Sequence, residues 1–315
     1  MAFAQPAAKV YRVGWLGYTA YNTPEDDRAV AAFRQRLRDL GFVEGANLVI
    51  EWRFAEGHND RYAEFAAELV RLQADAVVVS SGTAARAVMA ASRTLPIVTF
   101  AVADPVRSGL VASLAHPGGQ LTGMTNLPDE PVPKRLELLK VALPAATRVA
   151  YVRCPRCLAS GGVSEAEIAA NYQAQTEAAR RIGVVWKPLD VNDVADFAAA
   201  AAQLRSERPD AIIIGATQIN SALQREWLAL ASELRVATFA PYRGYGAMLS
   251  YGPEYSAIMR RVAEYVARIL RGTPPTERPM EQPTVFEFVV DARAARAIGV
   301  DVSPALRLRA DVILD

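Results

Sequence analysis

The sequence has almost no excess of charge of either sign. Its 315 residues include 35 lysines and arginines against 34 aspartates and glutamates, which gives a net charge of +1 with histidine neutral. Proteins that bind a phosphate backbone need a basic excess, and basic residues here occur at most in adjacent pairs. We therefore expect no nucleic acid among the partners.

Long apolar runs are also missing. A membrane-spanning helix needs about 20 apolar residues, and stretches such as FAAAAAQL at 197–204 are far shorter. The first residues, MAFAQPAAK, contain the small-x-small pattern Ala2-Phe3-Ala4 that a signal peptidase recognises. We expect an exported, periplasmic protein whose apolar signal region has been removed, with an unstructured Ala/Pro terminus as the alternative.

The sequence lacks the motifs that mark common enzymes. There is no GxGxxG after the first strand, and no GxxxxGK[ST], GxSxG or HExxH. The two histidines, His58 and His116, lie in turn-like segments and are expected at the surface. Glu25-Asp26-Asp27 begins a predicted helix, where acidic side chains complement the helix dipole. We expect no catalytic residue, no cofactor and no metal.

Only two cysteines are present, Cys154 and Cys157, in a CxxC arrangement. Three interpretations are open: a disulfide within a loop, two free thiols, and a redox or zinc site. A redox site requires a thiol of lowered pKa at a helix start, and zinc requires two more ligands. An oxidising compartment outside the cytoplasm favours the disulfide.

Apolar runs of strand length alternate with longer stretches of helical period, which is the pattern of an α/β fold with parallel sheets. A chain of this length exceeds what one core usually supports, so two Rossmann-like lobes are expected. The segment ADAVVVSSGTAARAV (74–88) resembles PDAIIIGATQINSAL (209–223), and IVTFA (97–101) resembles VATFA (236–240). These similarities predict an internal duplication.

The Gly/Pro-rich segment 117–133 is predicted to be the first connection between the lobes. A long amphipathic helix is predicted at 254–271, between two further apolar runs, so we expect three crossings. The predicted N-terminal lobe takes 1–122 and about 246–280, and the C-terminal lobe takes 123–245 and about 281–315. A ligand cleft is predicted between them.

Ligands of open parallel sheets bind outside the carboxyl ends of the strands, where helix N-termini offer free N–H groups. The candidate ligand-binding residues therefore follow the predicted strands: Tyr18, Thr19, Ser81, Gly82, Thr83, Asp104, Thr217, Gln218, Pro241, Tyr242 and Arg243. For Ser81 and Asp104 an ordinary capping role is the alternative.

Three segments carry a resemblance to a known family: ADPVRSGLVASLAHPGGQLTG (103–123), GAMLSYGPEYSAIMRRVAEYVARILRG (246–272) and MEQPTVFEFVVDARAARAIGVDVSP (280–304). In these the chain resembles the ABC-transporter substrate-binding family that includes the tryptophan- and tyrosine-binding lipoproteins of bacteria. The resemblance implies a type I periplasmic-binding-protein fold with a three-crossover hinge, a non-enzymatic receptor for a small-molecule ligand, and an ABC permease as partner. It places family contact positions on the candidate residues from Tyr18 to Tyr242.

The class of ligand is predicted from the positions at which this sequence differs from the amino-acid-binding members of the family it resembles. The segments 215–220 and 240–245 contain no carboxylate, so the second lobe is expected to offer none to a ligand ammonium group. Arg243 suits a carboxylate, and flat rings could stack on tyrosines, namely Tyr18, Tyr21, Tyr242 and Tyr245. We expect a monomer that binds an aromatic or small organic acid, with Arg243 in solvent as the alternative. A sensor for a signalling partner and a CxxC redox enzyme are the rival functions.

Overall fold

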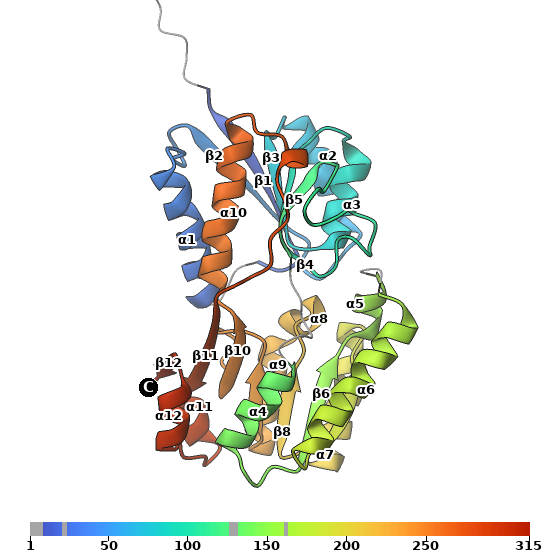
Figure 1. The fold of residues 1–315 in the computed structure, drawn as a ribbon, viewed down its shortest axis with the longest axis vertical. Helices are drawn as coiled ribbons and strands as arrows, with labels where there is room; N and C mark the ends of the chain where they lie inside the picture. The colour runs from blue at the N-terminus through green and yellow to red at the C-terminus, as the bar shows by residue number, and fades with distance from the viewer. Residues whose placement is uncertain (1–8, 21–23, 126–131, 161–162) are drawn as a thin grey trace, which may run out of the picture. The chain divides into compact units, whose positions relative to one another are not determined.

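The computed structural model describes residues 9–20, 24–125, 132–160 and 163–315, which form two compact α/β units (Figure 1). The first unit comprises Met1–Asn22, Asp26–Asn126 and Ser256–Gln282, and the second comprises Thr23–Glu25, Leu127–Tyr255 and Pro283–Asp315. Apart from residues 23–25, the chain thus passes between the units at 126–127, 255–256 and 282–283. Ala2-Phe3-Ala4 and Tyr21 lie outside the described residues.

The first unit is built on a five-stranded parallel sheet in the order β2-β1-β3-β4-β5. Its strands are β1 Tyr11–Gly17, β2 Leu48–Phe54, β3 Ala76–Val79, β4 Ile97–Val102 and β5 Leu121–Thr125. Its helices are α1 Pro24–Asp39, α2 Arg61–Arg71, α3 Gly82–Ala91 and most of α10 Tyr255–Leu270. In Figure 1, α2 and α3 cover one face of the sheet while α1 and α10 lie side by side on the other.

The second unit carries a seven-stranded sheet in the order β12-β11-β10-β9-β8-β6-β7. Its strands are β6 Arg148–Arg153, β7 Val185–Asp190, β8 Ala211–Ile214, β9 Ala237–Ala240, β10 Leu249–Pro253, β11 Phe286–Asp291 and β12 Val312–Leu314. Its helices are α4 Val132–Ala142, α5 Pro155–Ser160, α6 Glu165–Arg181, α7 Phe197–Glu207, α8 Gln218–Ala222, α9 Gln224–Leu234, α11 Ala292–Ala297 and α12 Pro304–Arg309. None of the helices in the described ranges is long and apolar enough to cross a membrane.

The two sheets share one strand order, which confirms the duplication predicted from the sequence. In chain order the first sheet runs 2-1-3-4-5, and the second begins with the same pattern, β7-β6-β8-β9-β10. The second sheet then adds β11, which runs antiparallel to β10, and β12. Because β11 runs antiparallel to β10, the first residues of β11 lie beside the carboxyl ends of the parallel strands.

The predicted connection at 117–133 contains structure at both of its ends. Residues 121–125 form β5, which pairs with β4, and α4 begins at Val132. Gly123 adopts a φ of +123°, and a Cβ there would lie 2.2 Å from the carbonyl oxygen of Thr99. The glycine therefore permits a close approach of two strands, and the first boundary falls four residues later than expected, at 126. Residues 246–255 likewise belong to the second unit, because β10 pairs with β9 and β11.

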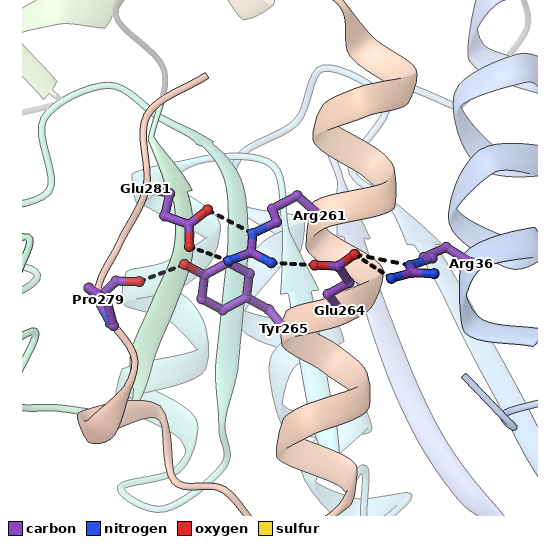
Figure 2. Close-up of polar contacts among 6 residues, drawn as sticks. All are labelled: Arg36, Arg261, Glu264, Tyr265, Pro279 and Glu281. Atoms are coloured by element: carbon purple, nitrogen blue, oxygen red, sulfur yellow. Dashed lines mark hydrogen bonds and ion pairs between the residues drawn. The ribbon is translucent and has the colours of Figure 1, made fainter. Parts of the chain in front are cut away.

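The segment just before the third connection is anchored to the first unit. Glu281 forms a parallel bridge with Met124: its N–H donates to the Gly123 carbonyl at 2.9 Å, and its own carbonyl accepts from the Thr125 N–H at 2.8 Å. The Tyr265 hydroxyl donates to the Pro279 carbonyl at 2.6 Å. Figure 2 shows Tyr265 of α10 reaching toward Pro279 and Glu281.

An ion-pair network extends from this anchor to α1 (Figure 2). Arg261 pairs with Glu281 and with Glu264, and Glu264 accepts from Arg36 Nη2 at 2.7 Å. The hydrogen bonds from Arg261 lower the pKa of Glu281. The pKa of Glu264 is also lowered, because the bonds from Arg261 and Arg36 outweigh the opposing effect of burial. Both carboxylates are thus stabilised in their charged form.

The ion-pair network should make the first unit less stable at acid pH than at neutral pH. Because the folded pKa values of Glu264 and Glu281 are lowered, their contribution is complete above the ordinary glutamate pKa of about 4.3 and is lost as pH falls through the folded values. Glu264→Gln should therefore cost about 1 kcal/mol at pH 7, and progressively less as the pH falls below the ordinary glutamate pKa. Thermal melts of both proteins between pH 3 and 7 measure the difference. Glu277→Gln, at an exposed position of the same unit, is the control, and a cost for Glu264→Gln that does not change with pH contradicts the prediction.

Candidate functional site

Both units place polar residues where their strand order reverses. In a 2-1-3-4-5 sheet this switch point lies between β1 and β3, and ligands bind outside the carboxyl ends of the strands there. In the first unit Tyr18 follows β1 and Ser81 follows β3. In the second unit Cys154 follows β6 and Thr217 follows β8. Three of these four residues are predicted ligand contacts, and the fourth belongs to the CxxC pair.

The first unit assembles Tyr18 and the β3 turn around a buried tyrosine. Tyr18 is 6% exposed and its hydroxyl donates to the Gly57 carbonyl at 3.2 Å. Tyr62, from α2, is fully buried, and the hydroxyls of Ser80 and Ser81 approach its Oη without a well-aligned hydrogen bond. Burial raises the pKa of Tyr62 to about 12, so its hydroxyl stays neutral at pH 7. Sequence reasoning missed Tyr62 because it lies on the apolar stripe of a helix.

The Ser81-Gly82-Thr83 turn caps α3. The Ser81 hydroxyl oxygen accepts from the Ala84 N–H at 3.1 Å, while Thr83 is exposed and Thr19 is half-buried. A Cβ at Gly82 would lie 3.4 Å from Leu110, which is an ordinary contact. The structure thus shows the capping role of Ser81, and a ligand contact at this turn stays a prediction.

Asp104 also caps a turn. Its Oδ1 accepts from the Arg107 N–H at 2.9 Å, and its Oδ2 lies 3.5 Å from the Arg107 guanidinium. The Asp104 side chain is 35% exposed. This geometry accounts for Asp104 without a ligand, although a carboxylate keeps further acceptor positions.

The second unit gathers three tyrosines, which we call the tyrosine cluster: Tyr242, Tyr245 and Tyr255. The Tyr242 ring stacks on Tyr255 with centroids 5.7 Å apart and meets Tyr245 edge-on at 5.4 Å. The Ser221 hydroxyl of α8 lies 3.3 Å from the Tyr242 hydroxyl and 3.0 Å from that of Tyr245. Tyr242 and Tyr245 were candidates from the sequence, whereas Ser221 and Tyr255 were not. Tyr245 is 2% exposed and belongs to the core of the unit, so the expectation that a ligand ring stacks on it is wrong, whereas Tyr242 and Tyr255 are half-buried.

The start of α8 is fixed to β6 beside this cluster. Asn220 is fully buried and its amide donates to the carbonyls of Val152 and Gly215 at 3.3 and 3.0 Å. The Thr217 hydroxyl oxygen accepts from the Asn220 N–H at 3.1 Å. In the part of the chain that the structure describes, the buried Nε2 of Gln218 has no hydrogen-bond partner. A buried donor without a partner is costly, and a ligand acceptor would satisfy it.

Arg243 lies beside a carboxylate that sequence reasoning missed. Its Nη1 is 4.0 Å from Glu287 Oε2, and the two side chains are 18% and 12% exposed. Glu287 belongs to the start of β11, which reaches this edge only because β11 is antiparallel. The expectation that the second lobe offers no carboxylate here is therefore wrong, as is the alternative that Arg243 projects into solvent.

Gly252 explains how the segment after β9 can cross β10. Gly252 is opposite Glu287 in the β10–β11 ladder, and opposed residues face the same side of the sheet. A Cβ on Gly252 would lie only 1.8 Å from the Pro241 carbonyl oxygen. The missing side chain thus lets the chain at Pro241 pass over β10, and Arg243 follows two residues later, beside Glu287.

Arg135 of α4 is buried beneath the point where the chain at Pro241 passes over β10, and it donates hydrogen bonds to both segments. Its side chain is 1% exposed, with Nε donating to the Tyr251 carbonyl at 2.9 Å and Nη2 to the Pro241 carbonyl at 3.3 Å. Proline has no N–H, so Pro241 ends the β9 ladder. The guanidinium supplies donors where the ladder stops, and so it fixes the base of the segment that carries Tyr242 and Arg243.

The two cysteines form a disulfide at the second switch point. Cys154 and Cys157 are joined across the start of α5, with Cα atoms 5.2 Å apart. The Cys157 N–H also donates to Cys154 Sγ at 3.1 Å, and Cys154 is 1% exposed. The bond fixes the turn after β6 in one conformation.

Comparison with protein families and with curated proteins gives two matches. Residues 21–313 match the model of a family described as ABC transporter substrate binding protein. A tyrosine-binding protein of Clostridioides difficile is 32% identical over 129 residues, which is 41% of this chain and 37% of that relative. The alignment therefore spans little more than a third of the relative's length.

Solved structures resemble the whole chain. A conserved domain protein from Vibrio cholerae superposes with a TM-score of 0.81 at 25% identity, covering 97% of this chain and all of that one. An ABC domain from Streptococcus pneumonia in complex with L-tryptophan has the same TM-score and coverage at 18% identity. A ligand-free, open substrate-binding protein from Clostridium difficile has a TM-score of 0.66 at 21% identity, covering 97% of this chain and 99% of that one. These neighbours confirm the predicted type I periplasmic-binding-protein fold.

Proposed function

Because this chain belongs to the family of ABC transporter substrate-binding proteins, we propose that it is the periplasmic receptor of an importer for a small aromatic molecule that bears a carboxylate. The family binds its substrates and does not convert them, so the protein is not an enzyme. The ABC permease is the proposed partner, and a monomer is the proposed working form. Export through a signal peptide belongs to the same proposal.

One observation carries the ligand class: the tyrosine cluster lies next to a cationic side chain. Tyr242 stacks on Tyr255, and the adjacent residue in the chain is Arg243. Aromatic rings prefer offset or edge-on packing against other rings, and a guanidinium can bind a carboxylate through two hydrogen bonds. The unpartnered Nε2 of Gln218 supplies a further donor.

The named relative supports the aromatic character of the ligand. It is a tyrosine-binding protein, similar to this chain over 129 residues. The proposed contacts are the candidates at the strand ends of both units: Tyr18, Thr19, Ser81, Gly82, Thr83, Asp104, Thr217, Gln218, Pro241, Tyr242 and Arg243. Tyr255 of the tyrosine cluster, which is half-buried, joins them, while the buried Tyr245 supports Tyr242 by its edge-on ring contact.

A thermal-shift screen tests this function. The panel contains L-tyrosine, L-tryptophan, 4-hydroxyphenylacetate, indole-3-acetate, tyramine, succinate, glucose and uridine. A ligand that binds only the folded state at 100 times its Kd stabilises it by about 2.7 kcal/mol. We expect a saturable rise in melting temperature with aromatic carboxylates and little with tyramine, which lacks the carboxylate.

Two outcomes of the screen would contradict the proposal. Stabilisation by glucose or uridine alone would show that the ligand is not an aromatic carboxylate, because neither compound carries a carboxylate. Conversion of a bound compound, detected by chromatography after incubation, would show an enzyme. The sensor alternative shares the ligand site and differs in the partner, so pull-down with the permease of the same operon decides between them.

A further inference from the structure

The disulfide in the turn after β6 contributes little to the overall stability of the second unit. It joins two cysteines that are only three positions apart, and a crosslink stabilises a fold less when it encloses fewer residues. Small domains without a sufficient core depend on disulfides, whereas this unit has large buried clusters around residues such as Trp227 and Phe239. The effect of the bond is therefore local to its own turn.

The two sulfur atoms differ in how easily another thiol can reach them. Cys154 is 1% exposed, whereas Cys157, in the first turn of α5, is half-buried. Thiol–disulfide exchange begins when an external thiolate attacks one of the two sulfurs, and access decides which sulfur is attacked. Attack on this bond is therefore directed to Cys157, and Cys154 is the sulfur that leaves.

A hydrogen bond favours the departure of Cys154 as a thiolate. Its Sγ accepts from the Cys157 N–H at 3.1 Å, and a donor aimed at a sulfur stabilises the charged form of that sulfur. The exposed Arg156 adds a positive charge to the same turn. A stabilised leaving thiolate makes exchange faster and the disulfide easier to reduce.

We propose that the Cys154–Cys157 disulfide is a reversible exchange site for an external dithiol, and that its reduction loosens the turns after β6 and β8. One thiolate of the dithiol bonds to Cys157 Sγ, the bond between the cysteines breaks, and Cys154 leaves with the electron pair. The second thiolate of the dithiol then attacks the sulfur bound to Cys157, closes a disulfide with it, and releases Cys157. The two protons lost by the dithiol go to the two cysteine thiolates, so the dithiol is oxidised by two electrons and the protein is reduced by two.

The partner is a dithiol because Cys154 stays beside the mixed disulfide on Cys157. The Cα atoms of the two cysteines lie 5.2 Å apart, so the Cys154 thiolate attacks Cys157 again and expels a bound monothiol. A dithiol competes with this return reaction, because its second sulfur attacks within the same complex at a high effective concentration. The exchange modifies the protein and converts no substrate.

The end of β6 connects the disulfide to the start of α8. The Val152 carbonyl, two residues before Cys154, accepts from the Gly215 N–H at 2.8 Å and from the Asn220 amide at 3.3 Å. These bonds hold the turn after β8, which leads into α8 and carries Gln218. When the link between the cysteines opens, the end of β6 loses a constraint, and the turn attached to it becomes more mobile.

The direction of attack is tested with two variants that each keep one thiol. Folded Cys154→Ser and Cys157→Ser proteins react with 5,5′-dithiobis(2-nitrobenzoate), and the released thionitrobenzoate is followed by absorbance. Cys157, which the first variant keeps, should react at least about tenfold faster than Cys154, which the second keeps. In urea the two rates should agree, which is the control. Equal rates in the folded proteins overturn the proposal.

Reduction of the folded wild type tests the exchange without any substitution. The protein is incubated with dithiothreitol or with glutathione at equal thiol concentration, trapped with N-ethylmaleimide and analysed by mass spectrometry, while circular dichroism verifies that it stays folded. Dithiothreitol should reduce the disulfide at least about tenfold faster than glutathione. A disulfide that opens only after unfolding in urea overturns the proposal, and so does equal reduction by both reagents.

Hydrogen exchange measures the loosening that follows reduction. Amides of α5 and of the first turn of α8 should exchange at least about threefold faster in the reduced protein than in the oxidised one. Amides of β1 to β5, which belong to the other unit, should not change. Equal protection of α8 in both forms overturns the link between the two turns. None of these measurements contains a ligand, so failure of the proposed function would leave their outcomes unaffected.

Discussion

Replacing Arg135 with leucine should lower the free energy of unfolding of the second unit by about 3–5 kcal/mol. Leucine fills most of the space of the side-chain stem but cannot donate to the carbonyls of Tyr251 and Pro241. Two buried acceptors are then left without these donors, and each costs about 1–3 kcal/mol. Urea unfolding followed by circular dichroism measures the loss.

The same variant should weaken ligand binding. The segment from Pro241 to Tyr245 loses its attachment to α4, so Tyr242 and Arg243 are less well positioned, and Kd should rise about tenfold or more. Arg135→Lys keeps the positive charge but cannot reproduce the two directed hydrogen bonds of the guanidinium. The stability and the affinity of this variant should therefore lie between those of the wild type and of Arg135→Leu. Lys134→Leu, at an exposed position of the same helix, should stay within about 0.5 kcal/mol of the wild type. An Arg135→Leu protein as stable as this control would show that the carbonyls find other donors.

Much of the fold was predictable from the period of the hydrophobic residues and from the internal repeat in the sequence. The β1 to β4 strands and their counterparts β6 to β9 are short apolar runs between amphipathic helices, and the similarity of 74–88 to 209–223 pointed to two related units. Such patterns are local, so they survive in a single sequence. The missed β5 illustrates the limit: Gly123 looks like a turn residue in the sequence, and only the contact with Thr99 shows that it serves a strand.

The candidate site was predictable only where strand ends define it. Tyr18, Ser81, Thr217 and Tyr242 follow parallel strands, so the fold class alone led to them. Contributions from elsewhere were missed because they depend on tertiary structure. Glu287 reaches the site through strand direction, Arg135 through a buried position on a helix, and Ser221 through packing of α8 against the segment after β9.

Gly252→Ala should destabilise the segment after β9, which carries Tyr242 and Arg243, more strongly and more locally than any other single substitution considered. The new Cβ would lie 1.8 Å from the Pro241 carbonyl oxygen, and a backbone atom cannot rotate away as a side chain could. The segment after β9 must therefore lift from β10, which should cost about 3 kcal/mol or more. Hydrogen exchange should rise in β9, β10 and β11 and remain unchanged in β1 to β5, because those strands belong to the other unit.

The functional consequence of Gly252→Ala follows from the position opposite Glu287. Lifting the Pro241–Tyr245 segment moves Arg243 away from Glu287, so aromatic ligands should lose at least about tenfold in affinity even where the protein is folded. Gly119→Ala is the matched control, since a Cβ there meets no atom within 4 Å, and it should change neither stability nor affinity by more than about 0.5 kcal/mol. Wild-type affinity in a folded Gly252→Ala protein would mean that the ligand does not depend on the crossing of Pro241 over β10. The centre of the ligand site would then lie not at the tyrosine cluster and Arg243 but at the strand ends of the first unit that carry Tyr18 and Ser81.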